Sequence, residues 1–364
     1  MTTLESLKSN LLALTARSGV SGNEQEVVQY LADCFRPLAD ELVIDNFGNL
    51  IATRRGEERA PSMMIAAHSD EVGFVITTIT PDGFLRFQTM GAVGNTLLPA
   101  TRVLVAGRYP GVIGAIPGHL TRGELGEKVQ PPDVLHIDIG ATSEAEARAW
   151  GIREGTTATY LSEILPMQNS NLVFGKAIDN RIGCAVLLET FQQLRGRSLP
   201  GTVYGVVNVM EEIGMRGARM TSTRIQPDFA IVLDTVPADD TPLGKNNPAL
   251  SFRLGKGPVI QTIEGVKGIF SGHIIHPRVL DLILKAAEIA QQPIQLAAAY
   301  GNWTTDGSAI NVTGTGIPTG SVCIARRYAH SPNEVCDLRD AEGAVKILVA
   351  LADTAVIGAN LNFL

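Results

Sequence analysis

Hydrophobic residues near the start of the chain recur at the spacing of one helix face, in two successive stretches. Leucines mark the first stretch, over residues 4–14, and the second runs from Val27 to Phe35. The second stretch follows Ser21-Gly-Asn-Glu24, which has the serine-to-glutamate spacing of a capping box. Because apolar side chains three and four residues apart share one face of a helix, the pattern predicts two amphipathic helices.

Strand-like and helical patterns then alternate along much of the chain. Runs typical of strands lie at 41–44, 49–53, 62–67, 202–210 and 229–233. Helical patterns lie at 181–194, near Gly217, at 280–291 and at 341–357. Such alternation predicts an α/β fold, which we expect to have three layers around a mixed sheet.

One segment departs from this alternation. Between residues 71 and 163, short β-rich runs are separated by glycine and proline turns, with a single helical stretch at 142–150. This pattern of short strands and turns predicts an inserted β-barrel-like domain over residues 71–163. Residues 1–70 and 164–364 would then form one discontinuous α/β domain.

Composition and charge exclude several classes of protein. The 364 residues are 45% hydrophobic and 18% charged, which fits a globular chain and excludes disorder. The formal net charge of −7 argues against a nucleic acid or an acidic membrane surface as partner, because either would favour a basic face. No apolar run reaches the roughly 18 residues that a membrane helix needs. The four cysteines are scattered and no targeting segment is visible, so we expect reduced thiols and a cytoplasmic location.

Five residues with oxygen or nitrogen ligand atoms stand at predicted strand ends or in the loops that follow. They are His68, Asp179, Glu212, Asp234 and His330. Strand ends are where open α/β sheets build their sites, and carboxylates and imidazoles suit a pair of divalent metals. Asp179, before a predicted helix, is the natural bridge, because a carboxylate between two metals offsets their repulsion. Taken singly, the aspartate could equally cap the helix, and each histidine could pack in the core.

Two adjacent glutamates, Glu211 and Glu212, stand at the end of the apolar strand predicted at 202–210. Neighbouring side chains in a strand point to opposite faces, so both can serve one site only if the strand ends there, as Gly214 favours. One glutamate would then bind metal while the other accepts a proton from water; the alternative is a solvated acidic turn. Asp70, two residues after His68, would accept the other imidazole N–H, or is simply a loop acid.

Seven short segments carry these residues or flank them in the sequence. They are Ala67-His-Ser-Asp-Glu-Val-Gly73, Gly111-Val-Ile-Gly-Ala-Ile-Pro117, Lys176-Ala-Ile-Asp-Asn-Arg181, Glu211-Glu-Ile-Gly-Met-Arg-Gly217, Asp234-Thr235, Thr305-Asp-Gly-Ser308 and Arg327-Tyr-Ala-His-Ser-Pro332. In this order they resemble the M42 family of metallo-aminopeptidases, the group of the glutamyl aminopeptidases and the tetrahedral TET peptidases. The resemblance spans nearly the whole chain, and seven segments in family order are far more specific than any one of them.

The resemblance implies a metal site and a reaction. His68, Asp179 and Asp234 would hold one divalent metal. Asp179, Glu212 and His330 would hold the other. Glu211 would be the general base for a hydroxide that bridges the two metals and attacks the N-terminal peptide bond of short peptides. Zinc is the expected metal, and the ligand types also suit cobalt or manganese.

The resemblance also implies how copies of the chain assemble. The segment 71–163 would be a dimerisation domain, and dimers would build a homo-oligomer, up to a dodecameric hollow shell that admits short or unfolded peptides.

Other functions stay open at this point. The same ligand pattern serves carboxypeptidases and N-deacylases, from which a preference for a free amine over a free carboxylate would discriminate an aminopeptidase. Glu211 with a second carboxylate would also suit a glycosidase, against which metal dependence would argue. A catalytically silent oligomeric homologue would keep the fold alone, but such relatives are marked by a missing ligand and none is missing here.

Overall fold

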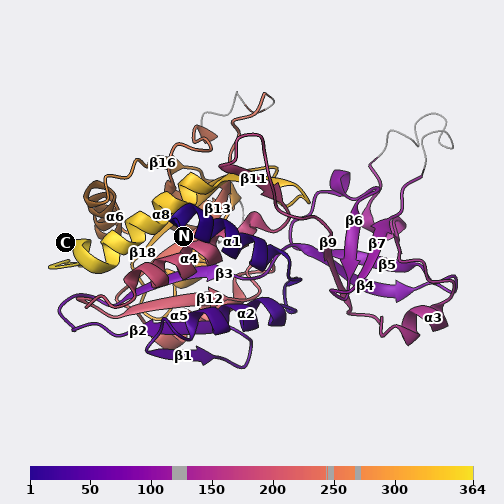
Figure 1. Cartoon of the computed structure of the whole chain (residues 1–364), viewed down its shortest axis with the longest axis horizontal. Helices are drawn as coiled ribbons and strands as arrows, with labels where there is room; N and C mark the ends of the chain where they lie inside the picture. Colours follow the sequence, from indigo (N-terminus) through magenta and orange to yellow (C-terminus); the bar gives the residue numbers. More distant parts are fainter. Residues whose placement is uncertain (117–128, 243, 245–249, 267–271, 364) are drawn as a thin grey trace.

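The chain folds into an α/β body and a β-barrel that stands to one side of it (Figure 1). The computed structural model describes residues 1–116, 129–242, 244, 250–266 and 272–363. One mixed sheet forms the body, and its main path has the strand order β1-β2-β12-β3-β13-β18-β19-β11-β10. Helices cover both faces of this sheet, so the predicted three-layer α/β fold is confirmed.

The strands of the main path differ in length and in burial. They are β1 Glu41–Ile44, β2 Leu50–Arg54, β12 Val203–Asn208, β3 Met63–His68, β13 Phe229–Pro237, β18 Thr319–Arg327, β19 Glu334–Asp337, β11 Leu172–Gly175 and β10 Leu165–Pro166. A side branch beside β18 adds β14 Val259–Val266, β15 Gly272–Ile274, β16 Gln295–Ala298 and β17 Asn302–Trp303.

Four strands at the centre of the sheet run parallel. β12 pairs with β3, β3 with β13 and β13 with β18. Every residue of β3 is buried, as expected for a strand covered on both faces. Because these strands are parallel, their carboxyl ends meet at one edge of the sheet, and the loops that follow lie together there.

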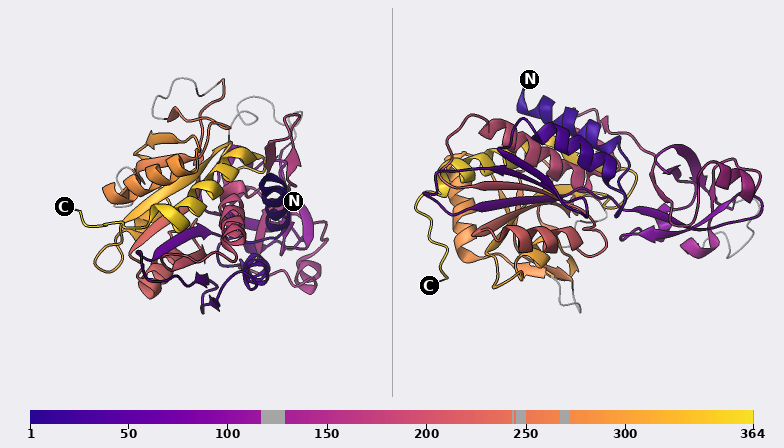
Figure 2. Two further views of the ribbon diagram at one scale, coloured as in Figure 1. Left: turned by 60° about the vertical axis from the view of Figure 1, so that its left-hand side comes forward. Right: turned by 90° about the horizontal axis from the view of Figure 1, so that it is seen from below.

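The helices divide into two layers. On one face lie α1 Thr3–Thr15, α2 Gln25–Phe35, α4 Ile178–Leu194, α6 Pro277–Ile289 and α8 Leu338–Ala350, which a π-helical turn at Leu351–Ala355 extends. On the other face lie α5 Arg216–Ile225 and α7 Gly307–Ile310. Figure 2 shows the sheet between these layers.

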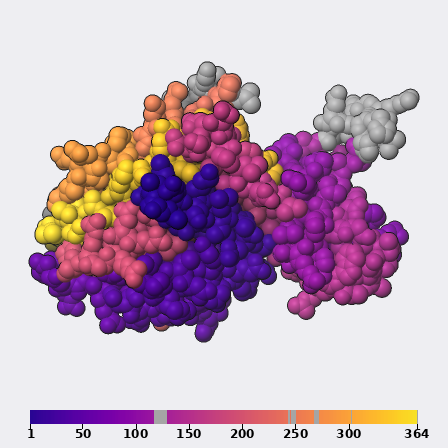
Figure 3. Space-filling model, in the orientation of Figure 1, coloured from indigo at the N-terminus to yellow at the C-terminus, as the bar shows by residue number. Residues whose placement is uncertain are grey.

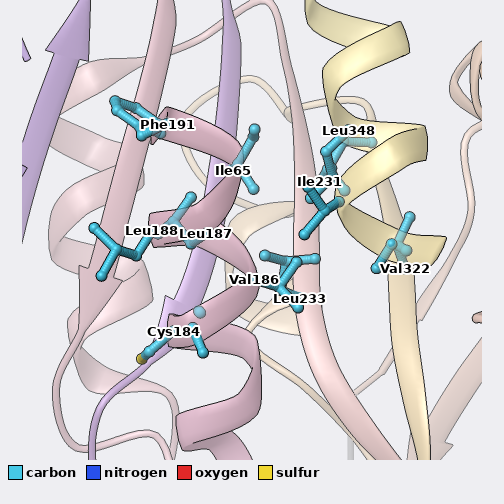
Figure 4. Close-up of a cluster of buried hydrophobic side chains, with 14 of the residues drawn as sticks. Ile65, Cys184, Val186, Leu187, Leu188, Phe191, Ile231, Leu233, Val322 and Leu348 are labelled. Carbon is cyan, nitrogen blue, oxygen red and sulfur yellow. The ribbon is translucent and has the colours of Figure 1, made fainter. Parts of the chain in front are cut away.

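The main core lies between α4 and the parallel strands. Val186 and Leu187 of α4 are fully buried in the same cluster as Ile65 and Ile231 of the sheet (Figure 4). Helix α4 is the central helix of its layer. Its apolar sequence fits this position, because the helix is buried almost all round.

Both N-terminal helices form where the periodicity predicted them, but the predicted capping box at the second is wrong. Helix α2 has Glu24 as its N-cap, and no side chain caps it. The Ser21 hydroxyl instead donates to Asp70 Oδ2 at 2.6 Å, and Glu24 Oε1 accepts from the Met210 N–H at 3.0 Å. Tertiary partners near the carboxyl edge of the sheet have replaced the local ones.

The inserted segment forms a closed six-stranded barrel with its own core. Its strands, in barrel order, are β4 Gly73–Ile79, β5 Leu85–Met90, β8 Ile137–Asp138, β7 Tyr109–Ile113, β6 Arg102–Val105 and β9 Thr157–Tyr160. Helix α3 Glu144–Ala149 and 3-10 turns at Asn95–Leu97 and Pro132–Val134 lie between them. Inside, Phe74 meets Phe87 and Tyr160 edge to face at 5.3 and 5.4 Å. The space-filling view shows the barrel projecting from the body (Figure 3).

Within the described part of the chain, no helix is long and apolar enough to cross a membrane.

A buried charge cluster joins the barrel to the body. Glu71, between β3 and β4, accepts from Lys176 Nζ at 2.9 and 2.8 Å and from Thr159 Oγ1 of the barrel at 2.6 Å. Arg181 Nη2 of α4 lies 3.3 Å from the same carboxylate. Glu71, Lys176 and Arg181 are all at most 5% exposed. The cluster therefore fixes the segments that carry Asp70 and Asp179 against the barrel.

We expect Lys176→Met to lower the free energy of unfolding by about 3 kcal/mol, because it leaves a buried carboxylate with one cation fewer. Urea titration of the metal-free protein measures this. Lys346→Met is the matched control: its ammonium pairs with Glu342 at 2.9 Å and its side chain is 46% exposed, so the cost should be about 0.5 kcal/mol. An equal loss in the free energy of unfolding for both variants would show that the Glu71 cluster adds nothing to the stability of the fold.

Candidate active site

The carboxyl edge of the parallel strands carries the residues that the sequence singled out. His68 is the last residue of β3, and Glu211 and Glu212 follow the end of β12 at Asn208. Asp179 lies in an irregular first turn of α4, and His330 lies in the loop between β18 and β19. Parallel strand direction thus brings together residues that are up to 262 positions apart in the chain.

One of the predicted positions needs correction. Asp234 was expected at a strand end, but β13 continues to Pro237 because it stays paired with β18 as far as Arg326. Asp234 therefore lies within a strand, not after one. For the two glutamates the condition stated above is met, since β12 ends three residues before Glu211.

Two groups of potential ligands form, and Asp179 belongs to both. In the first group, His68 Nε2 lies 3.3 Å from Asp179 Oδ1 and 3.7 Å from Asp234 Oδ1. In the second, His330 Nε2 lies 3.2 Å from Asp179 Oδ2 and 3.6 Å from Glu212 Oε1. Within each group the ligand atoms all lie within 4.8 Å of one another. Asp179 thus presents one carboxylate oxygen to each group.

The other two candidates lie beside these groups without belonging to them. Glu211 Oε2 is 3.9 Å from His68 Nε2. Asp70 Oδ1 is 3.3 Å from the other ring nitrogen of His68. Asp70 also accepts from the backbone N–H groups of Glu211 and Glu212, at 2.9 and 3.0 Å. It therefore connects the first histidine to the glutamate pair, a contact that its sequence spacing did not show.

The backbone around the site is held in an unusual conformation. Positive φ angles occur at Ala177 (56°), Met210 (57°), Met215 (52°), Tyr328 (57°) and His330 (57°). All five are non-glycine residues next to or within a ligand-bearing loop. Such strain is found where the surrounding structure fixes a functional geometry, because each case costs about 1–3 kcal/mol.

The carboxylates of the site repel one another in a buried setting. Burial, together with the charges of Asp234 and Glu212, raises the pKa of Glu211 well above its usual range. Burial likewise raises the pKa of Glu212 to about 8 and that of Asp234 to about 6. These three carboxyls therefore hold protons more tightly than in water, because burial and the neighbouring carboxylates disfavour their charged forms.

The pKa values of the shared Asp179 carboxyl and of the imidazoles shift in the opposite sense. Burial alone would raise the pKa of Asp179, but the Arg326 guanidinium and the two imidazoles hold it well below its usual range. Burial alone would lower the pKa of His330, but Glu212 and Asp179 raise it to about 9. The pKa of His68 is raised well above its usual value by the same kind of surroundings, against the effect of burial. Positive charge is thus favoured between these groups.

The donor set fits divalent metals. Among the described residues, the buried oxygens Asp179 Oδ1 and Glu212 Oε1 have no hydrogen-bond partner. Buried polar atoms are nearly always paired, so two unpaired carboxylate oxygens beside imidazole nitrogens are suitable ligands for divalent cations.

Sequence reasoning missed several residues around the groups. Asp306 Oδ2 accepts from Asn208 Nδ2 at 2.8 Å, and burial raises the pKa of Asp306 to about 7. Arg326 and Glu334 form an ion pair at 2.7 Å behind the second group. Asp306 belongs to the segment Thr305-Asp-Gly-Ser308, to which sequence reasoning assigned no separate role, and no spacing in the sequence points to the other two.

A sequence model of the M42 glutamyl aminopeptidase family matches residues 48–347 of the chain. The chain belongs to the M42 peptidase family. The resemblance inferred from the seven segments is therefore confirmed, and with it the class of enzyme, a peptidase.

Named relatives of this M42 peptidase differ in their stated preference. It is 32% identical to the glutamyl aminopeptidase of Lactococcus lactis, over 90% of each chain. It is also 32% identical to the lysyl aminopeptidase of Pyrococcus furiosus, over 92% of this chain and 93% of that one.

Solved structures agree with the fold. An aminopeptidase from the archaeon Desulfurococcus kamchatkensis superposes with a TM-score of 0.89 at 36% identity, covering 97% of this chain and 95% of that one. The TET1 peptidase of Pyrococcus horikoshii, which can assemble into a tetrahedron or a large octahedral shell, gives a TM-score of 0.82 at 31% identity, covering 97% and 100%.

Proposed function

We propose that this M42 peptidase is a two-metal aminopeptidase that removes the N-terminal residue from short peptides. One observation carries the proposal: Asp179 presents one oxygen to each of two ligand groups, His68 with Asp234 and Glu212 with His330. Glu211 lies beside the first group and belongs to neither. This division leaves one glutamate to hold metal and one to move a proton.

Each residue then has a separate task. Bound divalent cations would supply Lewis acidity and lower the pKa of water. Glu211 would accept the proton of the attacking water and return it to the leaving amine. Asp70 would fix the ring of His68 and, through the two backbone N–H groups, the place of Glu211 relative to the ligands.

An aminopeptidase must recognise a free α-amine, so we expect peptides with acetylated N-termini to resist cleavage. A mixed peptide library, each member supplied free and acetylated, is digested and followed by LC-MS, before and after metal is stripped and restored. Stepwise, metal-dependent loss of N-terminal residues from free peptides alone is the expected result. Comparable cleavage of the acetylated set would overturn the proposal.

The same experiment distinguishes the rival reactions. Release of C-terminal residues would indicate a carboxypeptidase, and release of acetate would indicate an N-deacylase. Absence of turnover with every restored metal, in protein that binds two metals, would favour a catalytically silent homologue.

We also propose that the barrel, taken as the inserted domain over residues 71–163, mediates dimerisation, and that dimers build a larger homo-oligomer. The assembly of the Pyrococcus horikoshii relative supports this, together with the projection of the barrel from the body (Figure 1). Native mass spectrometry measures the subunit count. Zinc as the native metal and a cytoplasmic location stay predictions.

A further inference from the structure

A buried ion pair stands directly behind the second ligand group. Arg326, near the end of β18, and Glu334, the first residue of β19, are only 4% and 2% exposed. Arg326 Nη1 donates to Glu334 Oε1 at 2.7 Å. The loop between these two residues carries His330. The pair therefore closes the base of the loop that presents this ligand.

The Glu334 carboxylate holds the backbone of two ligands at once. Its Oε1 accepts from the N–H of His330 at 2.7 Å, and its Oε2 accepts from the N–H of Asp179 at 3.0 Å. Neither ligand lies in regular structure, since His330 has a φ of 57° and Asp179 has non-helical angles inside α4. No helix or sheet ladder thus fixes them, and the shared carboxylate takes that role.

Arg326 extends the same framework to the shared aspartate and to β13. Its Nη2 donates to Asp179 Oδ2, and its Nε donates to Thr235 Oγ1 at 2.5 Å. Thr235 follows Asp234 in β13. A planar guanidinium can bind several acceptors in fixed directions, which the flexible ammonium of a lysine cannot do.

Glu334 itself is not a ligand. It belongs to neither ligand group found among the described residues, and both of its oxygens already accept hydrogen bonds. Its charge is balanced by Arg326, so it fixes geometry without adding to the negative charge that faces a cation.

We infer that Glu334, supported by Arg326, is a positioning residue that sets the second metal subsite formed by Asp179, Glu212 and His330. The inference rests on the proposed two-metal function. It predicts that the two binding steps respond differently, because Glu334 holds both the bridging ligand and the histidine of the second group but contacts neither His68 nor Asp234.

The test is Glu334→Gln, which keeps the shape but leaves one acceptor oxygen where two N–H groups and a guanidinium need partners. Calorimetric titration of the metal-free enzyme with Zn²⁺ should show one of the two binding steps weakened by about 10- to 100-fold, the usual effect of losing a group that orients a ligand. The other step should change much less. Titration with Co²⁺ should show the same loss in the visible absorption of one of the two equivalents.

Glu189→Gln is the matched control. Glu189 lies on α4, away from both ligand groups, and is also buried. Its carboxylate accepts a hydrogen bond from Ser6 Oγ at 2.5 Å. Its substitution should leave both binding steps unchanged, so any general effect of removing a buried carboxylate is subtracted.

The outcomes separate the two proposals. If the wild-type chain binds fewer than two metals, the proposed function fails. If it binds two and Glu334→Gln binds both as tightly, the inference is overturned while the function stands. If Glu334→Gln does not fold, Arg326→Lys replaces it under the same criteria. Unfolding of both variants would also overturn the inference, because the pair would then serve the fold and not the subsite.

Discussion

Glu211→Gln should lower kcat by about 10²- to 10⁴-fold while both metals stay bound, the range that a general base contributes. The glutamine keeps the size of the side chain but cannot accept a proton. Because Glu211 lies outside both ligand groups, 3.9 Å from His68 Nε2, metal affinity should change little. Steady-state kinetics on a free dipeptide substrate and metal analysis of the same sample measure the two effects together.

Glu212→Gln provides the contrast, since it makes the same chemical change one residue away. Glu212 Oε1 faces His330 Nε2 at 3.6 Å in the second group, so this variant should lose metal as well as activity. A Glu211→Gln variant with wild-type kcat would place the general base elsewhere. Loss of metal from Glu211→Gln, with retention by Glu212→Gln, would exchange the two roles.

Asp179→Asn should reduce metal binding at both groups and lower activity by about 10³-fold or more, because bound metals contribute several kcal/mol of transition-state stabilisation. One oxygen of Asp179 serves each group, and an amide offers only one neutral oxygen in place of two charged ones. The metal content after dialysis, read as ions per chain, should fall below that of any single-group variant such as Asp234→Asn.

Asp340→Asn is a suitable control for a buried aspartate. Its carboxylate accepts from the N–H groups of Gly255 and Gly257 at 2.7 and 2.8 Å, in a part of the fold that holds no ligand. Burial raises the pKa of Asp340 to about 7, so the uncharged form is accessible near neutral pH and an amide is a mild change. Metal content should stay at the wild-type level, and two ions per chain in Asp179→Asn would contradict the bridging role.

Some expectations from the sequence failed because a local pattern met a stronger tertiary partner. Ser21 and Glu24 have capping-box spacing, yet Ser21 donates to Asp70 and Glu24 accepts from Met210, 186 residues away. The strand at Asp234 is longer than its apolar run, because pairing with β18 continues past the polar residue. Burial and strand pairing decided both cases, and a short stretch of sequence does not show with which distant residues it will pair.

The sequence by itself determined the fold class, the barrel within it and the family, because hydrophobic periodicity and the order of motifs can be recognised in the amino-acid sequence alone. It also pointed to the candidate ligand residues, since parallel strands bring their carboxyl ends to one edge of the sheet. Only the tertiary structure decided how these residues meet: that Asp179 faces two imidazoles, that Asp70 holds the glutamate pair, and that Glu334 joins the backbones of two ligands 151 residues apart. Those contacts depend on where loops from distant segments lie in the folded chain. Buried charges there require partners that no sequence spacing specifies.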